Sequence, residues 1–223
     1  MTRVHQHRPL MLIGFSVATL VVLAVAPLVG PEFISPLTLV QDPHGTDAGI
    51  LAQIRIPRIA TAFLAGAALS LSGMTFQAMF RNPLATPYTL GVASGASLGA
   101  AVYIRLGLAF SLAGLSGLTL AGFAGALLSL GIVYGLTRLR GGFSSATLLL
   151  AGVAVSFSFS SLILFIQYIS GLRHSFQIVR RLMGSLDVVG YQAAGNILPF
   201  MLAGVLLLIW LTRDLNLLST GED

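Results

Sequence analysis

The sequence contains no cysteine and no lysine, and only 12 arginines and 7 acidic residues carry charge among its 223 positions. The lack of cysteine excludes disulfide bonds, thiolate metal ligands and a cysteine nucleophile. The charged fraction of 9% lies far below the roughly one quarter of a soluble domain, which excludes a charged, water-facing surface. The arginines form no basic stripe with interleaved aromatic residues, which argues against nucleic acid binding.

Long uncharged apolar runs make up most of the chain, which is 56% hydrophobic with a mean hydropathy of +0.91. Residues 59–80 contain no charge, and at about 1.5 Å per helical residue they cross a hydrocarbon core about 30 Å thick. We therefore predict an all-α, polytopic membrane helix bundle that forms one transmembrane domain over residues 1–223. The predicted spans are about 10–30, 59–80, 86–104, 118–136, 145–168 and 193–211.

Arg55 and Arg58 bracket Pro57 directly before the second predicted span. Pro57 suits the first turn of a helix, because an N–H group at that position would have no intrahelical acceptor. The two arginines are three positions apart, so they lie on one face of this turn, at a membrane rim. Two interpretations follow: the guanidinium groups anchor to lipid phosphate, or they form bidentate bonds with carboxylates of a docking protein.

Small residues recur at every fourth position of the third span, as Gly91, Gly95 and Gly99. Such residues let two helix backbones approach closely in a membrane, so we assign these glycines to helix packing. The pattern G-x-S-x-G around Ser97 carries a serine nucleophile in hydrolases. The predicted spans contain no histidine, aspartate or glutamate, which argues against an intramembrane serine hydrolase and against an ion-coupled secondary transporter.

The fifth span carries Ser156, Ser160 and Gln167 among apolar residues. Serines in membrane helices often bond their own backbone or support helix packing. In the alternative interpretation these three side chains line a translocation path, because a bulky polar solute needs a wide polar route. Both interpretations stay open from the residues alone.

Five motifs follow one another between Arg55 and Ala100: Arg-Ile-Pro-Arg, Gly-Ala-Ala-Leu-Ser-Leu-Ser-Gly, Gln77, Arg-Asn-Pro-Leu-Ala and Leu-Gly-Val-Ala-Ser-Gly-Ala. Together they resemble the membrane permeases of bacterial ABC importers for iron-siderophores, haem and cobalamin (FecCD-type). The resemblance implies a permease that moves a chelate of one of these types across the inner membrane. It implies no enzyme activity in this chain.

The resemblance also implies roles for individual residues. Arg55 and Arg58 would receive glutamates of an extracytoplasmic substrate-binding protein. The resemblance further implies a cytoplasmic gate at Ser144 and Ser145, pore-lining positions at Ser156, Ser160 and Gln167, and a lead-in to ATPase-coupling helices at Asn216, Gly221 and Glu222. The chain lacks the pattern G-x-x-x-x-G-K-[ST], so separate ATPase subunits would use the ATP and this chain would bind no cofactor or metal. A second permease copy and membrane lipid are the other expected partners.

Charge bias does not set the orientation, because an N-terminus on the inside places six arginines on each side. The inner set is Arg3, Arg8, Arg81, Arg138, Arg140 and Arg213, and the outer set is Arg55, Arg58, Arg105, Arg173, Arg180 and Arg181. The resemblance favours cytoplasmic N- and C-termini. Family members have about ten spans, so the resemblance implies a permease that is incomplete after Asp223 and inactive alone. A fragment, an interrupted reading frame and one half of a split permease are all compatible with the sequence.

Overall fold

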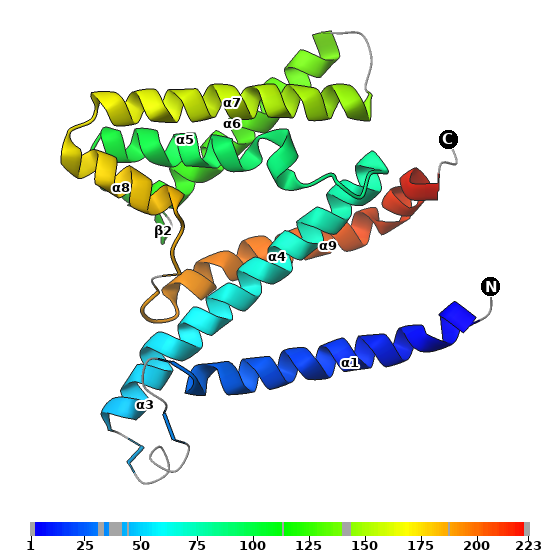
Figure 1. Cartoon of the computed structure of the whole chain (residues 1–223), viewed down its shortest axis with the longest axis vertical. Coiled ribbons are helices and arrows are strands. Elements are labelled where there is room, and N and C mark those ends of the chain that lie inside the picture. Colours follow the sequence, from blue (N-terminus) through cyan, green and yellow to red (C-terminus); the bar gives the residue numbers. More distant parts are fainter. Residues whose placement is uncertain are drawn as a thin grey trace. The chain divides into compact units, whose positions relative to one another are not determined.

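The computed structural model describes residues 3–30, 34–35, 42–43, 45–112, 114–139, 144–186 and 188–220. The α-helices are α1 (Arg3–Val25), α3 (Thr46–Ile50), α4 (Ile56–Phe80), α5 (Val92–Arg105), α6 (Gly117–Leu139), α7 (Ser145–Ile169), α8 (Leu172–Leu182) and α9 (Gln192–Thr220). Two 3-10 turns, η1 (Ala26–Leu28) and η3 (Pro87–Leu90), and one π-helix, η2 (Leu51–Arg55), adjoin them. A short antiparallel pair, β1 (Ser111–Leu112) and β2 (Leu115–Ser116), precedes α6 (Figure 1).

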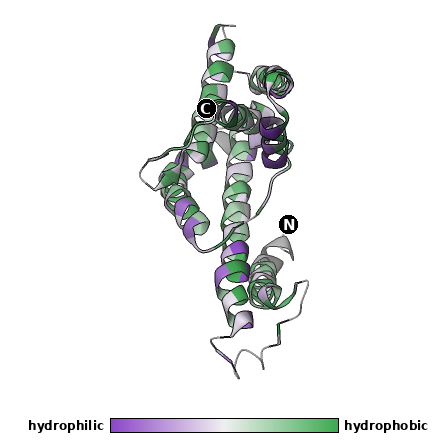
Figure 2. Cartoon of the chain, turned by 90° about the vertical axis from the view of Figure 1, so that its left-hand side faces the viewer, coloured by the Kyte–Doolittle hydropathy of each residue, from purple (hydrophilic) through white to green (hydrophobic). Residues whose placement is uncertain are grey.

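Five helical stretches of the described residues are long and apolar enough to cross a membrane. These stretches are Pro9–Leu28, Thr46–Phe80, Gly117–Leu139, Ser145–Ile169 and Gln192–Leu217. Figure 2 shows apolar colour along most of the helical surface and hydrophilic colour only in short stretches. This is the pattern of a chain whose main solvent is lipid, and it confirms the prediction of an all-α, polytopic membrane protein.

The third predicted span, 86–104, is not one continuous helix of membrane length. Pro87 begins the 3-10 turn η3, and Gly91 ends it with a left-handed backbone at φ 74°. α5 begins only at Val92, and its 14 residues cover about 21 Å, less than a hydrocarbon core of about 30 Å. The break at Gly91 could not be seen in the hydropathy of the sequence. Residues 86–104 are uncharged throughout, and a glycine can adopt a left-handed backbone without any change in hydropathy.

The turn after α4 follows the predicted Arg-Asn-Pro pattern. α4 ends at Phe80, and Arg81 adopts a positive φ of 49°, which is uncommon for a residue with a side chain. Oδ1 of Asn82 then accepts a hydrogen bond of 2.9 Å from the backbone N–H of Leu84. This local bond offers the backbone an alternative to the helix, so the chain turns here and delivers Ala85 to the interior, where it is fully buried.

The chain divides into two compact units. Unit 1 comprises Met1–Gly66 and Leu186–Pro199, and unit 2 comprises Ala67–Ser185 and Phe200–Asp223. The divisions fall inside α4 and inside α9. The assignment of one transmembrane domain to residues 1–223 stays a prediction.

Unit 2 is built around α5, α6 and α7, which lie side by side (Figure 1). Its larger core cluster consists of Phe80, Ala85, Leu90, Val133, Val155 and Phe159. A second cluster joins Ala101 of α5, Ile163 of α7 and Ile178 of α8. The short helix α5 therefore packs against α6, α7 and α8 and is the centre of this unit.

Among the described residues, fewer side chains are buried in unit 1 than in unit 2. From Pro9 to Val25 the side chains of α1 are exposed except that of Leu23, and none of the membrane-length window Pro9–Leu28 is buried. A groove of about 470 Å³ lies between α1 and the first turns of α4, with Phe15, Val22 and Phe63 among its lining residues. The hydrogen bonds that join the elements of unit 1 lie instead near the ends of its helices.

Candidate functional site

The rim that carries Arg55 and Arg58 is a continuous helical stretch rather than a fresh helix start. Helical structure begins at Thr46 and passes through the π-helix η2 into α4, so Pro57 is the second residue of α4 and does not stand at a free helix end. Pro57 lies in the first turn of α4, in line with the prediction, but α3 and η2 already precede this turn. The π-helix is the local device that lets a proline, which lacks an N–H group, sit within a helical run.

Arg55 and Arg58 have different surroundings. Nη1 of Arg55 donates hydrogen bonds to the backbone carbonyl oxygens of Pro27 and Leu28, at 3.1 and 3.2 Å. The guanidinium lies against Gly30, where an added Cβ would come within 2.8 Å of Nη2. Arg55 is half-buried by these contacts, whereas Arg58 is exposed. The two predicted docking residues are therefore neighbours on the rim, but their surroundings suit different tasks.

A second connection reaches the same stretch from the segment before α9. The backbone N–H of Gly190 donates a hydrogen bond of 2.7 Å to the carbonyl oxygen of Gln53, inside η2. Gly190 has a left-handed backbone at φ 71°. Three parts of unit 1 therefore meet at the rim: the end of η1, the π-helix and the lead-in to α9.

The predicted small-residue stripe lies where α5 meets α6. An added Cβ at Gly95 would run into the carbonyl oxygen of Gly125 and would lie 2.7 Å from Cβ of Ser129. At Gly99 it would run into the carbonyl oxygen of Ala121. The two backbones approach so closely that neither position has room for a side chain.

Gly91 lies close to α6 and α7, but it does so from a turn and not from the face of α5. It lies outside α5 as the N-cap residue, and its left-handed backbone turns the chain from η3 into the helix. Its carbonyl oxygen accepts a hydrogen bond of 2.8 Å from the buried hydroxyl of Ser129. A Cβ there would also lie 3.2 Å from Oγ of Ser156. Gly91 is a turn residue at a three-helix junction and not part of the helix face.

The three pore-lining candidates lie along one side of α7, because intervals of four and eleven residues bring them to nearly the same angle. Ser156 is half-buried, and its hydroxyl donates 2.8 Å to the carbonyl oxygen of Gly152 in its own helix. Ser160 is exposed, and Gln167 is half-buried. The three residues lie beside the face of α7 on which Val155, Phe159 and Ile163 are buried. The pore-lining role of the three residues stays a prediction.

The remaining candidates lie at the ends of the long helices. Ser144 is the N-cap of α7, its side chain makes no capping bond, and both Ser144 and Ser145 are exposed. Asn216 is exposed near the end of α9. Gly221 and Glu222 lie outside the described residues. The gate and coupling roles of these five residues stay predictions.

Three residues that pack against α5 or the preceding turn η3 were not singled out from the sequence: Gly125, Ser129 and Gly152. Ser129 is fully buried, and an added Cβ at Gly152 would run into the carbonyl oxygen of Thr89. A signal for two of them was present, because Ala121, Gly125 and Ser129 repeat at every fourth position, as the α5 glycines do. Two matching stripes on consecutive helices indicate a shared interface.

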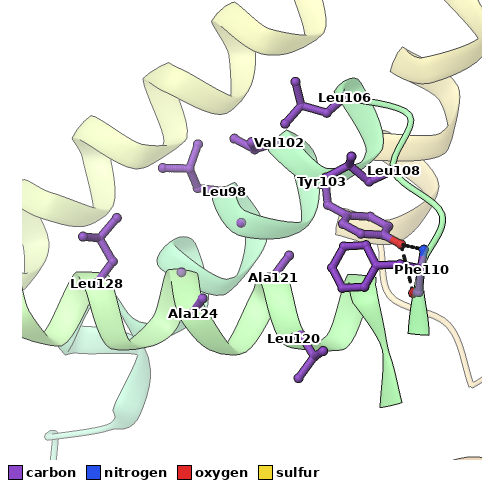
Figure 3. A pocket seen from close by; sticks show the side chains of 12 residues that line it. Leu98, Val102, Tyr103, Leu106, Leu108, Phe110, Leu120, Ala121, Ala124 and Leu128 are labelled. Atoms are coloured by element: carbon purple, nitrogen blue, oxygen red, sulfur yellow. Dashed lines mark hydrogen bonds between the residues drawn. The ribbon is translucent and has the colours of Figure 1, made fainter. Parts of the chain in front are cut away.

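A cavity of about 650 Å³ between α5 and α6 could be mistaken for a substrate site (Figure 3). Its lining is apolar except for the hydroxyl of Tyr103, which accepts a hydrogen bond of 3.2 Å from the backbone N–H of Phe110. The Tyr103 and Phe110 rings meet edge to face, with centroids 5.6 Å apart. The polar atom is thus directed at the backbone, and the cavity offers a polar chelate nothing to bind.

The comparisons with known proteins cover nearly the whole chain. The profile of the FecCD transport family matches residues 16–223. The uncharacterized ABC transporter permease protein YvrB of Bacillus subtilis is 41% identical over 183 residues, which make up 82% of this chain and 51% of the relative. The cobalamin import system permease protein BtuC of Halobacterium salinarum is 36% identical over 174 residues, or 78% of this chain and 46% of the relative.

A solved structure shows the same fold. An ABC transporter of the metal-chelate type, in an inward-facing conformation, matches with a TM-score of 0.76 and 31% sequence identity. The match covers 95% of this chain and 63% of that chain. The chain spans about half the length of the curated relatives it matches.

Proposed function

Because the chain belongs to the FecCD transport family, we propose that it acts as the membrane permease of an ATP-binding-cassette importer. The transported solute is a metal chelate of the iron-siderophore, haem or cobalamin type. The observation that carries the proposal is the family match over residues 16–223. The relative that imports cobalamin and the metal-chelate transporter structure support this class of solute.

One proposed partner follows from a motif that the sequence lacks, and the others follow from the family. No phosphate-binding pattern of the P-loop type occurs in the sequence, so separate ATPase subunits supply the energy. An extracytoplasmic substrate-binding protein delivers the chelate to the outer rim, and a second permease copy completes the path. In this arrangement the protein lies in the inner membrane with both termini in the cytoplasm.

The site residues take the following proposed roles. Arg55 and Arg58 form the docking rim, and Arg58 receives acidic side chains of the binding protein, because guanidinium groups form bidentate bonds with carboxylates. The exposed serines Ser144 and Ser145 stand at a narrow cytoplasmic gate. The polar stripe of α7, Ser156, Ser160 and Gln167, borders the path. Asn216, Gly221 and Glu222 lead into the contact with the ATPase.

The test is genetic and uses the gene in its own host. We expect deletion of the gene to abolish energy-dependent accumulation of one radiolabelled chelate among a ferric siderophore, haem and cobalamin, and re-expression to restore it. Vanadate, which inhibits ABC ATPases, should block the restored uptake, and a protonophore applied at constant ATP should not. A deletion strain that takes up all three solutes at the parental rate would refute the proposed solute class.

A further inference from the structure

We propose that Arg55 and Gly190 are positioning residues, which hold the π-helical stretch Leu51–Arg55 in the conformation that presents Arg58 to the docking partner. This inference rests on the proposed docking function of the rim. It divides the work between two arginines that the sequence presents as equivalent. Arg55 holds the rim in place, and the exposed Arg58 contacts the docking partner.

Pro57 removes one backbone hydrogen-bond donor from the helix. In an α-helix the carbonyl oxygen of Gln53 would accept a hydrogen bond from the N–H group of residue 57, four positions later. Pro57 has no N–H group, so this oxygen cannot form the α-helical bond; in a π-helix such as η2 its donor would be the N–H group of Arg58, five positions later. The N–H group of Gly190 reaches the same oxygen at 2.7 Å. This carbonyl oxygen thus becomes an attachment point for a distant segment.

Gly190 has a left-handed backbone. At φ 71° it occupies the left-handed region, which costs a residue with a Cβ about a factor of ten in equilibrium constant. Nothing lies within 4 Å of the place where a Cβ would stand. A substitution there therefore acts on the backbone conformation, and hence on the Gln53 bond, without a steric clash.

Arg55 connects η2 to the end of η1. Its Nη1 group contacts two carbonyl oxygens at the end of η1, where helix carbonyls lack intrahelical donors and attract a cation. Both hydrogen bonds come from the same nitrogen, Nη1, which therefore links the two consecutive carbonyl oxygens. Arg55 thereby fixes the end of the first membrane helix to η2. It does so from one side, and Gly190 does so from the other.

Arg58 lies one helical turn beyond Arg55. Its side chain is exposed, and it lies immediately after the fixed stretch. If either connection is released, η2 and the first turn of α4 gain conformations that present Arg58 differently. The apparent affinity for a partner then falls in proportion to the fraction that stays competent. Because Arg55 has this second task, reversing both arginines together cannot separate docking from folding.

The experiment measures binding of the purified cognate substrate-binding protein to the assembled membrane complex in nanodiscs. We expect Arg58→Gln to weaken binding most. Arg55→Gln and Gly190→Ala should each weaken it roughly three- to tenfold. Gly184→Ala is the matched control, because Gly184 has the same left-handed backbone at φ 77° and also an open Cβ position. It should leave the affinity unchanged.

The decisive comparison repeats Arg55→Gln and Gly190→Ala in the Arg58→Gln background. Positioning residues act through Arg58, so their effects should vanish there. Equal losses in both backgrounds, or no loss from Gly190→Ala with Arg58 present, would overturn the positioning role and leave docking intact. An unchanged affinity in Arg58→Gln would instead overturn the docking function itself.

Hydrogen exchange of the uncomplexed permease gives a readout that needs no partner. Pro57→Ala restores an N–H group that competes for the carbonyl oxygen of Gln53, so the amide of Gly190 should exchange faster. Gly190→Asn is the mild variant if Gly190→Ala lowers the yield, because asparagine tolerates the left-handed region. Unchanged exchange at Gly190 in Pro57→Ala would show that the connection does not depend on Pro57, against the inference.

Discussion

Helices α1 and α5 show two opposite ways of using an apolar sequence. α1 belongs to a 20-residue membrane-length stretch, Pro9–Leu28, yet none of its window is buried. α5 has 14 residues, too few to cross a membrane upright, and it lies at the centre of unit 2. The hydropathy of α1 serves its contact with lipid, whereas the small residues of α5 serve its contact with other helices.

The difference extends to what holds each region in place. In unit 2 the decisive feature is the lack of side chains, because Gly95 and Gly99 let two backbones touch. In unit 1 the decisive feature is a long polar side chain, because Arg55 reaches two carbonyl oxygens at a helix end. Adding atoms should therefore damage unit 2, and removing polar atoms should damage unit 1.

The largest effect is expected from Gly95→Leu. The leucine would meet the backbone of Gly125 and Cβ of Ser129, so α5 and α6 would have to separate, at a cost of at least about 3 kcal/mol. Thermal denaturation in detergent measures the loss. Ala96→Leu, one position away and off the glycine stripe, is the control. Equal melting temperatures for the two variants would contradict the close-packing account.

A smaller and cleaner effect is expected from Gly125→Ala. Its single added carbon would run into the carbonyl oxygen of Gly95, with an expected loss of about 1–3 kcal/mol. Gly131 lies on the same helix and has nothing within 4 Å of its Cβ position. Gly131→Ala should be neutral or stabilising by up to about 1 kcal/mol, since alanine is the better helix former. A loss of similar size at both positions would show that helix propensity, and not contact, governs α6.

Unit 1 should respond to the loss of a polar group. Arg55→Gln removes the bonds to Pro27 and Leu28, with an expected cost of about 1–2 kcal/mol to the attachment of α1. Limited proteolysis at the end of α1 would report this release. Arg58→Gln, in the same helix and exposed, should not change the cleavage rate. Faster cleavage in Arg58→Gln than in Arg55→Gln would reverse the assigned roles.

The smallest effect is expected from Ser129→Ala in unit 2. The buried hydroxyl donates to the carbonyl oxygen of Gly91, and its loss should cost about 0.6–1.7 kcal/mol, the range of hydrogen bonds between membrane helices. Ser158→Ala removes an exposed hydroxyl that bonds Ala154 of its own helix, and it should be nearly silent. A larger loss at Ser158 than at Ser129 would count against the junction at Gly91.

The sequence predicts much of this fold, because uncharged runs and charged gaps mark α4, α6, α7 and α9 directly. It does not reveal the break at Gly91, because a left-handed turn between two apolar stretches changes neither charge nor hydropathy. It also does not reveal that Arg55 reaches Pro27 and Leu28. That contact joins segments 27 and 28 residues apart, and no local pattern encodes it.

The candidate site was predictable to a similar degree. The rim and the small-residue stripe follow from local spacing, and the second stripe on α6 could have been found in the same way. The bond from Gly190 to Gln53 could not, because it joins segments far apart in the sequence and depends on a backbone conformation that only the fold provides.

The most direct test of the account measures chelate uptake by cells in which Arg58→Gln replaces the chromosomal gene. We expect unchanged amounts of inserted protein, and an initial uptake rate at limiting substrate at least about tenfold lower than that of the parent, because charge-paired contacts at an interface are costly to remove. Ser158→Ala should transport at the parental rate. Parental uptake by Arg58→Gln at every chelate concentration would contradict the claim that this rim receives the binding protein.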